Sequence, residues 1–267
     1  MVDVVVCGVA GRMGQRLANL VVDSEDLELA GGTERTGHEA IGKDVGEVVG
    51  GLHLGRLVDS HLGGVVDSGQ VVICFTTPEA TLEDAAICAA KGVSMVVGTT
   101  GMSDEQLEEF RHLVEPIPCV FAPNYSTAMN VLFKLVEEAA RILGDDYDVE
   151  VIEAHHRFKV DAPSGSALRL AEKAATGLER NLKEVAVFGR EGLVGERSRQ
   201  EIGVHAIRAG DLAGDHSVLF GAAGEYIELR HHATSRDAFA LGALRAVRFI
   251  HQAAPGFYDM GDVLGIK

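Results

Sequence analysis

The sequence predicts an α/β protein with a parallel sheet in its first half and an open, mixed sheet in its second half. In the first half, short apolar runs alternate with helical patterns, which is typical of a doubly wound parallel sheet. The first of these runs, Val2 to Cys7, leads directly into glycines and then a helical pattern. After Val149 the apolar runs follow one another with only one clear helix between them. This change of pattern favours a separate α+β domain.

The composition excludes several classes of partner. The 267 residues carry a formal net charge of -16, and an acidic surface disfavours both nucleic acid and anionic membranes. We find no apolar stretch of membrane-spanning length and no signal peptide before the first strand. The four cysteines are scattered without a C-x-x-C pair, which indicates buried free thiols in a reducing compartment. We therefore expect a cytoplasmic protein.

The glycine-rich turn after the first predicted strand is a candidate nucleotide site. Gly8, Gly11 and Gly14 are spaced G-x-x-G-x-x-G, and a helical pattern runs from Gln15 to Val22. Such a turn lets the backbone approach a pyrophosphate, and the following helix N-terminus favours its negative charge. Taken alone, the spacing fits a tight turn without a ligand equally well.

An acidic residue after the second predicted strand strengthens that interpretation. Leu27 to Ala30 is predicted as a strand, and Glu34 follows 20 residues after Gly14. An acid at this position can hold the two hydroxyls of a ribose. Arg12 and Arg35 could each meet a 2′-phosphate, so we expect both NADH and NADPH to be accepted. For Arg35 alone, a surface ion pair is the better interpretation.

Three later apolar runs extend the predicted sheet. They cover 71–75, 93–97 and 119–122, and each ends at glycine, proline or polar residues. Ligands of parallel sheets bind beyond the carboxyl ends of the strands. Five such ends are expected to share one edge, at Gly8, Glu34, Phe75, Gly98 and Ala122. The sequence therefore predicts a Rossmann dinucleotide-binding domain.

The second half is predicted to form a substrate and oligomerisation domain. Helical patterns cover 129–143 and 167–178, and strands are expected at 149–153, 185–188, 203–208, 216–221 and 225–231. A last helix, 239–251, and the tail are expected to return to the first domain. The predicted domains are thus 1–126 plus 237–267, and 127–236.

The segment from Glu153 to Ser166 concentrates reactive side chains. We expect His155 and Lys159 on a loop between a strand and a helix, where a scaffold can present them. An imidazole moves protons near neutral pH, and an ammonium can hold an anion or give up a proton. The N–H groups of Gly165 and Ser166 open the helix and could seat a carboxylate. These groups suit proton donation to an anionic small molecule.

A metal site is the alternative for the histidines of this chain. His155 and His156 could join His205 or the pair His231 and His232. However, the chain has no H-E-x-x-H motif, and the nearby lysine would repel a cation. We expect no metal, and we expect the pair His231 and His232 to have a surface role.

Together, these motifs resemble those of a known family, the 4-hydroxy-tetrahydrodipicolinate reductases (dihydrodipicolinate reductases) of bacterial lysine and diaminopimelate synthesis. The resemblance covers almost the whole chain. Its most specific part is the string from His155 to Gly165, His-His-x-x-Lys-x-Asp-Ala-Pro-Ser-Gly. Further similar segments are the turn 8–14, Glu34-Arg35, Phe75-Thr76, 98–101, Asn124, 208–211 and 214–216.

The resemblance implies a role for each matching residue. His155 would be the proton donor or acceptor and Lys159 a second proton donor, while His156, Gly165 and Ser166 would hold the carboxylates of the substrate. The residues implied in cofactor binding are Gly8, Val9, Ala10, Gly11, Arg12, Met13, Glu34, Arg35, Phe75, Gly98, Thr99, Thr100, Ala122, Pro123, Asn124 and Tyr125. The family reduces its cyclic dicarboxylate with NADH or NADPH, loses water, and yields tetrahydrodipicolinate. A homotetramer built on the second sheet is implied.

Two positions depart from the family pattern. Ser166 stands where members often have threonine, and the shared hydroxyl predicts little change. Thr77 stands where some members have arginine, which would weaken a grip on a 2′-phosphate and favours NADH slightly. Two other functions stay open from the residues alone: another NAD(P)-dependent imine or amino-acid dehydrogenase, and a non-catalytic dinucleotide sensor. Neither needs His155 beside Lys159 and the Pro-Ser-Gly turn.

Overall fold

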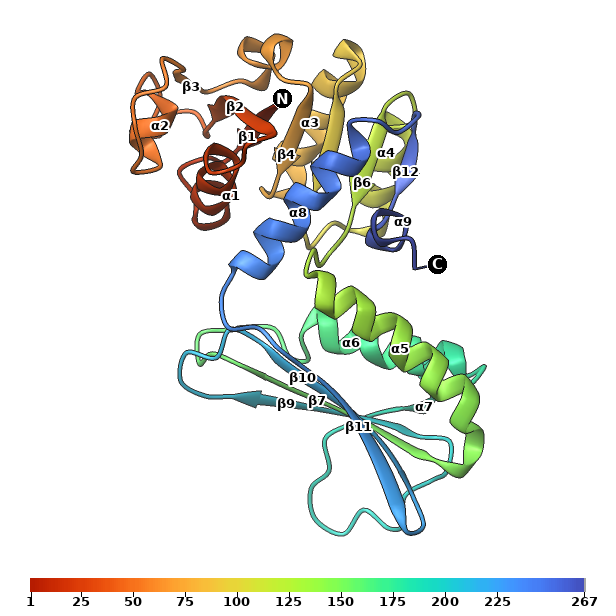
Figure 1. The fold of residues 1–267 in the computed structure, drawn as a ribbon. Helices are drawn as coiled ribbons and strands as arrows, with labels where there is room; N and C mark the ends of the chain where they lie inside the picture. The colour runs from red at the N-terminus through yellow and green to blue at the C-terminus, as the bar shows by residue number, and fades with distance from the viewer. Residues whose placement is uncertain (267) are drawn as a thin grey trace. The chain divides into compact units, whose positions relative to one another are not determined.

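The structure is a computed structural model that describes residues 1–266, and the chain divides into two compact units (Figure 1). The first unit comprises residues 1–127 together with 236–265, and the second comprises 128–235. The boundaries expected from the sequence lie one residue from these positions. No helix among the described residues is both long and apolar enough to cross a bilayer.

The first unit is built on a parallel sheet. Within the described residues this sheet has seven strands in the order β12-β6-β5-β4-β1-β2-β3, all paired in parallel. The strands are β1 (Val2–Cys7), β2 (Leu27–Thr33), β3 (Val58–Asp59), β4 (Val71–Cys74), β5 (Ser94–Val97), β6 (Pro118–Phe121) and β12 (Gly256–Tyr258). The strand order reverses between β1 and β4. The glycine turn that follows β1 therefore opens at the topological switch point, where such sheets bind ligands.

Helices cover both faces of this sheet. They are α1 (Arg12–Val22), α2 (Val45–Val48), α3 (Pro78–Lys91), α4 (Asp104–Leu113), α8 (Asp237–Ile250) and α9 (Met260–Leu264), with short 3-10 turns at Leu62–Gly64 and Val66–Ser68. Val4 and Val6 pack with Leu17 of α1 and Leu244 of α8, whereas Val5 joins the core that contains residues of α3 and α4. Because alternate residues of a strand point to opposite faces, a strand covered on both faces reads as a continuous apolar run.

Two helices of the first unit begin at clear cap residues. Ser103 forms a complete capping box with Gln106 at the start of α4. Thr77 caps α3, and Pro78 occupies its first position. Helix α8, which follows the second unit in the chain, packs against α1, as the expected return of the tail requires.

The second unit pairs a mixed sheet with helices on one face. Its five described strands run in the order β11-β10-β7-β9-β8, with β7 parallel to β9 and antiparallel to β10. They are β7 (Asp148–His155), β8 (Ala186–Phe188), β9 (Ile202–Arg208), β10 (Asp215–Ala222) and β11 (Glu225–His232). The helices are α5 (Thr127–Leu143), α6 (Gly165–Gly177) and α7 (Leu182–Val185), with a 3-10 turn at Gly144–Asp146. Figure 1 shows α5 and α6 lying along one side of this sheet.

Strand alternation decides which residues meet those helices. Val149 and Val151 of β7 and Val218 and Phe220 of β10 are buried in the core with residues of α5 and α6. The residue after Val151 on β7, Ile152, faces the other way and is 36% exposed. The sheet therefore has a helix-covered face and an open face, as the alternating pattern predicts.

A buried carboxylate organises the connection between β2 and β3. Asp44 caps α2 and accepts backbone hydrogen bonds from Gly46 (2.9 Å), Leu54 (3.0 Å) and Arg56 (3.0 Å). Burial opposes ionisation of this carboxyl group, but the backbone donors outweigh it and lower its pKa to about 2. The charged form of Asp44 is thus bound more tightly in the folded protein than in the unfolded chain.

We predict that Asp44→Asn lowers the free energy of unfolding at pH 7 by roughly 1–3 kcal/mol. The ordinary aspartate pKa is 3.8, so the contribution is complete above that pH and disappears as the pH falls towards 2. Urea unfolding of both proteins at pH 7 and pH 3 measures it. The gap between the two proteins should shrink at the lower pH, and an equal gap at both values would contradict this account.

Candidate active site

The glycine turn of the first unit is shaped for close approach. Gly8 has a positive φ of 67°, and a Cβ atom on Gly14 would lie 2.0 Å from the carbonyl oxygen of Gly8. Helix α1 therefore packs directly on the turn. Gly11 is the N-cap of α1, and in the described structure no side chain caps this end and no acid occupies the first turn. The backbone N–H groups in the first turn of α1 are therefore available to an anion, such as a pyrophosphate.

Glu34 lies beside this turn, as the sequence predicts. It follows the last residue of β2, and its Oε1 accepts a hydrogen bond of 3.0 Å from the backbone N–H of Ala10. An acid held against the glycine turn at the end of the second strand is positioned for ribose hydroxyls. Arg12 and Arg35, the candidate 2′-phosphate ligands, are both exposed. These residues fit a dinucleotide.

Several other predicted cofactor residues build the neighbouring strand ends. The ring of Phe75 packs on that of Tyr125, with centroids 5.2 Å apart, and a Cβ atom on Gly98 would lie 2.2 Å from the Phe75 ring. The Tyr125 hydroxyl is buried 2.9 Å from the carbonyl of Val97. Thr99 is also buried. The side chains of Tyr125 and Thr99 therefore hold the strand ends, and a cofactor could reach only the backbone there.

The remaining cofactor candidates differ in exposure. Thr100 and Pro123 are exposed, whereas Val9 and Ala122 are buried. Gly8, Ala10, Met13, Phe75, Gly98 and Asn124 are partly buried. Buried members of this group, like Tyr125 and Thr99, have only backbone groups to offer.

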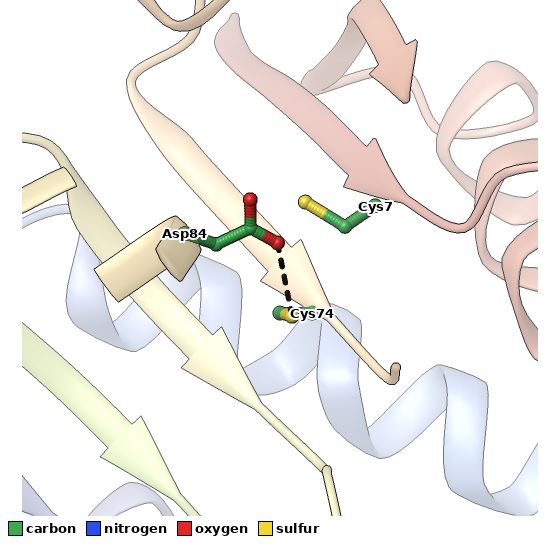
Figure 2. A group of neighbouring side chains, drawn as sticks. All are labelled: Cys7, Cys74 and Asp84. Atoms are coloured by element: carbon green, nitrogen blue, oxygen red, sulfur yellow. Dashed lines mark hydrogen bonds between the residues drawn. The ribbon is translucent and has the colours of Figure 1, made fainter. Parts of the chain in front are cut away.

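A thiol and carboxyl cluster lies beneath the same strand ends. Cys7 and Cys74 are register partners at the ends of β1 and β4, and Figure 2 shows both sulfurs turned towards Asp84 of α3. Cys74 donates a hydrogen bond of 3.6 Å to Asp84. Burial raises the pKa of Asp84, which favours its neutral form. Three ligands are fewer than the four of a closed structural zinc site, so we interpret the cluster as hydrogen-bonded packing. All four cysteines are buried and free, which confirms the expected thiols.

In the second unit, strand register gathers a polar group on the helix-covered face. Glu153 and His155 share this face of β7, because residues two apart point the same way. The ladder pairs His155 with Arg208, Glu153 with His216, and His216 with His231. The same face is apolar at Val149 and Val151. The sheet thus changes from apolar core to polar site along the length of β7.

The carboxylate of Glu153 is the centre of this group. It is fully buried, and its Oε2 accepts from His155 Nδ1 (2.6 Å) while its Oε1 accepts from the backbone N–H of Ser164 (3.0 Å). Arg208 donates to both oxygens, at 2.8 and 2.9 Å. Burial acts to raise the pKa of Glu153, but these donors outweigh it and lower that pKa below its ordinary value. Glu153 is therefore ionised.

The structure corrects the expected position of His155. It is the last residue of β7 and not part of the following loop. Its Nδ1 faces Glu153, and its Nε2 would lie 3.1 Å from a Cβ atom on Gly214. The ring also meets that of His216 edge-on, with centroids 5.2 Å apart.

Lys159 and His156 lie on the loop that follows β7. The Lys159 ammonium pairs with Asp161 at 2.8 Å, and that lysine side chain is 22% exposed. The backbone N–H of Lys159 donates to the carbonyl of His156, which closes a tight turn. Within the described structure, His156 Nδ1 is buried without a hydrogen-bond partner. An unpartnered ring nitrogen on this loop is suited to a ligand oxygen.

Helix α6 begins beside these groups. Ser164 caps it by accepting from the N–H of Ala167 (3.2 Å), and Gly165 and Ser166 are its first residues. A Cβ atom on Gly165 would meet no atom within 4 Å, so the fold itself does not need glycine there. The hydroxyl of Ser164 lies 3.2 Å from Nε2 of His216. Burial lowers the pKa of His216 to about 4, so this ring is neutral at pH 7.

Sequence reasoning missed part of this group. His231 is buried with its ring 6.2 Å from that of His216, so the expectation of a surface role is wrong for His231. His232, the other member of that pair, is an exposed partner of Asp215. Glu153 could have been recognised, since it lies two residues before His155 on a predicted strand. Arg208 and His216 come from other strands; their segments belong to the resemblance, but only the register shows that they lie beside Glu153 and His155.

Comparisons with known proteins place this geometry in a family. The family model described as "Dihydrodipicolinate reductase, N-terminus" matches residues 2–125, and the model described as "Dihydrodipicolinate reductase, C-terminus" matches residues 128–264. The chain belongs to the dihydrodipicolinate reductase family. This membership confirms the predicted reductase class, its NAD(P)H cofactor and the α/β fold with its second, mixed sheet.

Individual relatives agree with the family assignment. A protein of Syntrophobacter fumaroxidans named 4-hydroxy-tetrahydrodipicolinate reductase is 50% identical over 267 residues, all of both chains. One of Hahella chejuensis with the same name is 48% identical over the same span. Among solved structures, a dipicolinate-bound dihydrodipicolinate reductase from Paenisporosarcina sp. TG-14 is 27% identical, with a TM-score of 0.76 over 97% of each chain. An amine dehydrogenase from Mycobacterium smegmatis, 14% identical with a TM-score of 0.67 over 96% of this chain and 94% of its own, shares the fold alone.

Proposed function

We propose that the chain reduces 4-hydroxy-tetrahydrodipicolinate to tetrahydrodipicolinate with NADH or NADPH, releasing water, in lysine and diaminopimelate biosynthesis. The observation that carries this proposal is the group formed by His155, Lys159 and the start of α6. Two proton-carrying side chains stand beside a helix N-terminus that can seat a carboxylate. The names of the relatives and the dipicolinate bound by the Paenisporosarcina enzyme support the same substrate.

We infer that the first unit holds the cofactor at the glycine turn. The amide groups at the start of α1 would meet the pyrophosphate, and Glu34 the ribose hydroxyls. When bound, NAD(P)H supplies a hydride from C4 of its nicotinamide. Arg12 and Arg35 are exposed cations that can face a 2′-phosphate, while Thr77 offers none. Both cofactors are therefore accepted, with a slight preference for NADH.

The second unit would supply the proton. The net reaction consumes one proton, because a hydride replaces a hydroxyl group that leaves as water. His155 donates it from Nε2, since its Nδ1 is engaged by Glu153. Lys159 serves as a second donor and offsets the charge of the dicarboxylate. His156 Nδ1 and the N–H groups of Gly165 and Ser166 hold the carboxylates.

The proposal extends to the oligomeric state and the cellular compartment of the protein. The open face of the second sheet exposes Ile152, Ile207 and Tyr226, the last at 71%. Apolar residues on an open sheet face support association of identical sheets, and a homotetramer follows the family resemblance. Four buried free thiols suit a reducing compartment, which supports the cytoplasm.

The activity is tested by measuring the oxidation of NADH and of NADPH while the preceding synthase makes the substrate in situ. We predict turnover that requires the synthase product, with both cofactors active. In His155→Ala, turnover should fall roughly 10²–10⁴-fold while NADH affinity stays nearly constant, because an acid–base group is lost. Dinucleotide binding without turnover of this product by the unmodified protein would contradict the proposed function.

A second prediction concerns the carboxylate seat, the N–H groups of Gly165 and Ser166 at the start of α6. Gly165→Ala adds a methyl group where no protein atom lies within 4 Å, so folding should be unaffected. The same methyl group would occupy space beside the N–H groups that receive the substrate, and we expect KM to rise about tenfold, equivalent to ~1.4 kcal/mol of binding. Ser166→Thr is the matched control at the next position, and it should leave KM unchanged. An unaltered KM in Gly165→Ala would place the carboxylates elsewhere.

A further inference from the structure

We propose that Glu153 and Arg208 act as a charge-compensated positioning pair, which fixes the orientation of His155 and sets the pH range over which it carries a donatable proton. This inference rests on the proposed role of His155 as proton donor. Neither residue needs to touch the substrate, because both would act through the imidazole.

Arg208 and Glu153 form a bidentate ion pair. Two nitrogens of Arg208 donate to the two oxygens of Glu153, and the backbone N–H of Ser164 and Nδ1 of His155 complete the set. Two-point pairing of this kind fixes direction as well as distance. Arg208 also donates to the carbonyl of Asp161, at 2.6 Å. One buried carboxylate thus links β7, β9 and the loop that leads into α6.

This arrangement decides which nitrogen of His155 exchanges protons. A carboxylate at 2.6 Å from Nδ1 requires a proton on that nitrogen, whether the ring is neutral or charged. The proton that His155 gains and loses is therefore the one on Nε2. A carboxylate in this role holds the useful tautomer and stabilises the imidazolium form.

The two charges of the pair act on His155 in opposite directions. The anion of Glu153 favours the charged ring, and the guanidinium of Arg208 opposes it. The other titratable groups packed around the ring are His216 of β10, which is neutral at pH 7, and behind it His231 of β11 and Asp215. Removing Glu153 therefore acts on the ring in one direction, and removing Arg208 acts in the opposite direction.

The test compares the pH dependence of kcat in Glu153→Gln, Arg208→Gln and the double variant. Because His155 must carry a proton to act as a donor, kcat should fall on the alkaline side of the pH profile. We expect this alkaline limb to move to lower pH by about one unit in Glu153→Gln and to higher pH by about one unit in Arg208→Gln. In the double variant the limb should return close to its original position, while kcat stays at least about tenfold lower and KM changes little.

A second readout keeps the inference testable without turnover. The NMR titration midpoint of the His155 ring, measured in the absence of substrate, should move in the same opposite directions. The double variant removes both charges together and avoids an unpaired buried charge, so it guards against a single variant that does not fold. Shifts of the limb and midpoint in opposite directions support the inference. The contrary result is that, in folded variants, the alkaline limbs and titration midpoints stay in place or move in the same direction. The pair would then have only a structural role, and the inference would be overturned.

Failure of this inference is distinguishable from failure of the proposed function. Turnover by the unmodified protein tests the function, and the direction of the titration shifts tests the pair. Glu150→Gln is a suitable control. It removes a carboxylate of the same strand that lies on the open face with Arg190, Arg197 and His205. We expect that variant to leave the titration of His155 unchanged.

Discussion

The carboxylate of Glu153 is the constraint on which the second unit depends. It is fully buried, so it requires donors on every side, and it takes them from Arg208, His155 and Ser164. Each donor belongs to a different part of the chain. Meeting the needs of one anion therefore joins two strands and the cap of α6. His155 and the start of α6 are held in fixed relation because they share that anion, and Arg208 ties the loop at Asp161 to it.

Under the proposed function, this strongly acidic protein would meet its anionic ligands with local positive groups. In the first unit these are the uncapped start of α1 and the exposed guanidinium groups of Arg12 and Arg35. In the second unit they are Lys159 and the start of α6. Glu34 stands against the glycine turn, where it favours hydroxyl groups over phosphate. In the proposed function, local geometry would therefore override the net charge of -16, which by itself disfavours anions.

The sequence predicted what is encoded locally. Apolar runs and helical periodicity located the longer elements, because these signals lie within a few residues of the chain. The short strands β3 and β12 were missed, since two or three residues carry no periodicity and depend on their neighbours for pairing. His155 was placed on a loop because its motif resembles a turn, whereas the ladder with Arg208 extends β7 to it. The partners of Glu153 come from separate strands, and sequence spacing cannot reveal them.

Glu153 holds the Nδ1 edge of His155, and in the proposed mechanism this keeps the ring proton on Nδ1 and leaves Nε2 free to serve the substrate. The most direct measurement is ¹⁵N NMR of the His155 ring, labelled in the whole protein and observed above its titration midpoint. We predict that the neutral ring is the Nδ1–H tautomer, with that proton in a hydrogen bond that disappears in Glu153→Gln. A neutral ring protonated on Nε2, or a ring that exchanges freely between the two tautomers, would contradict it.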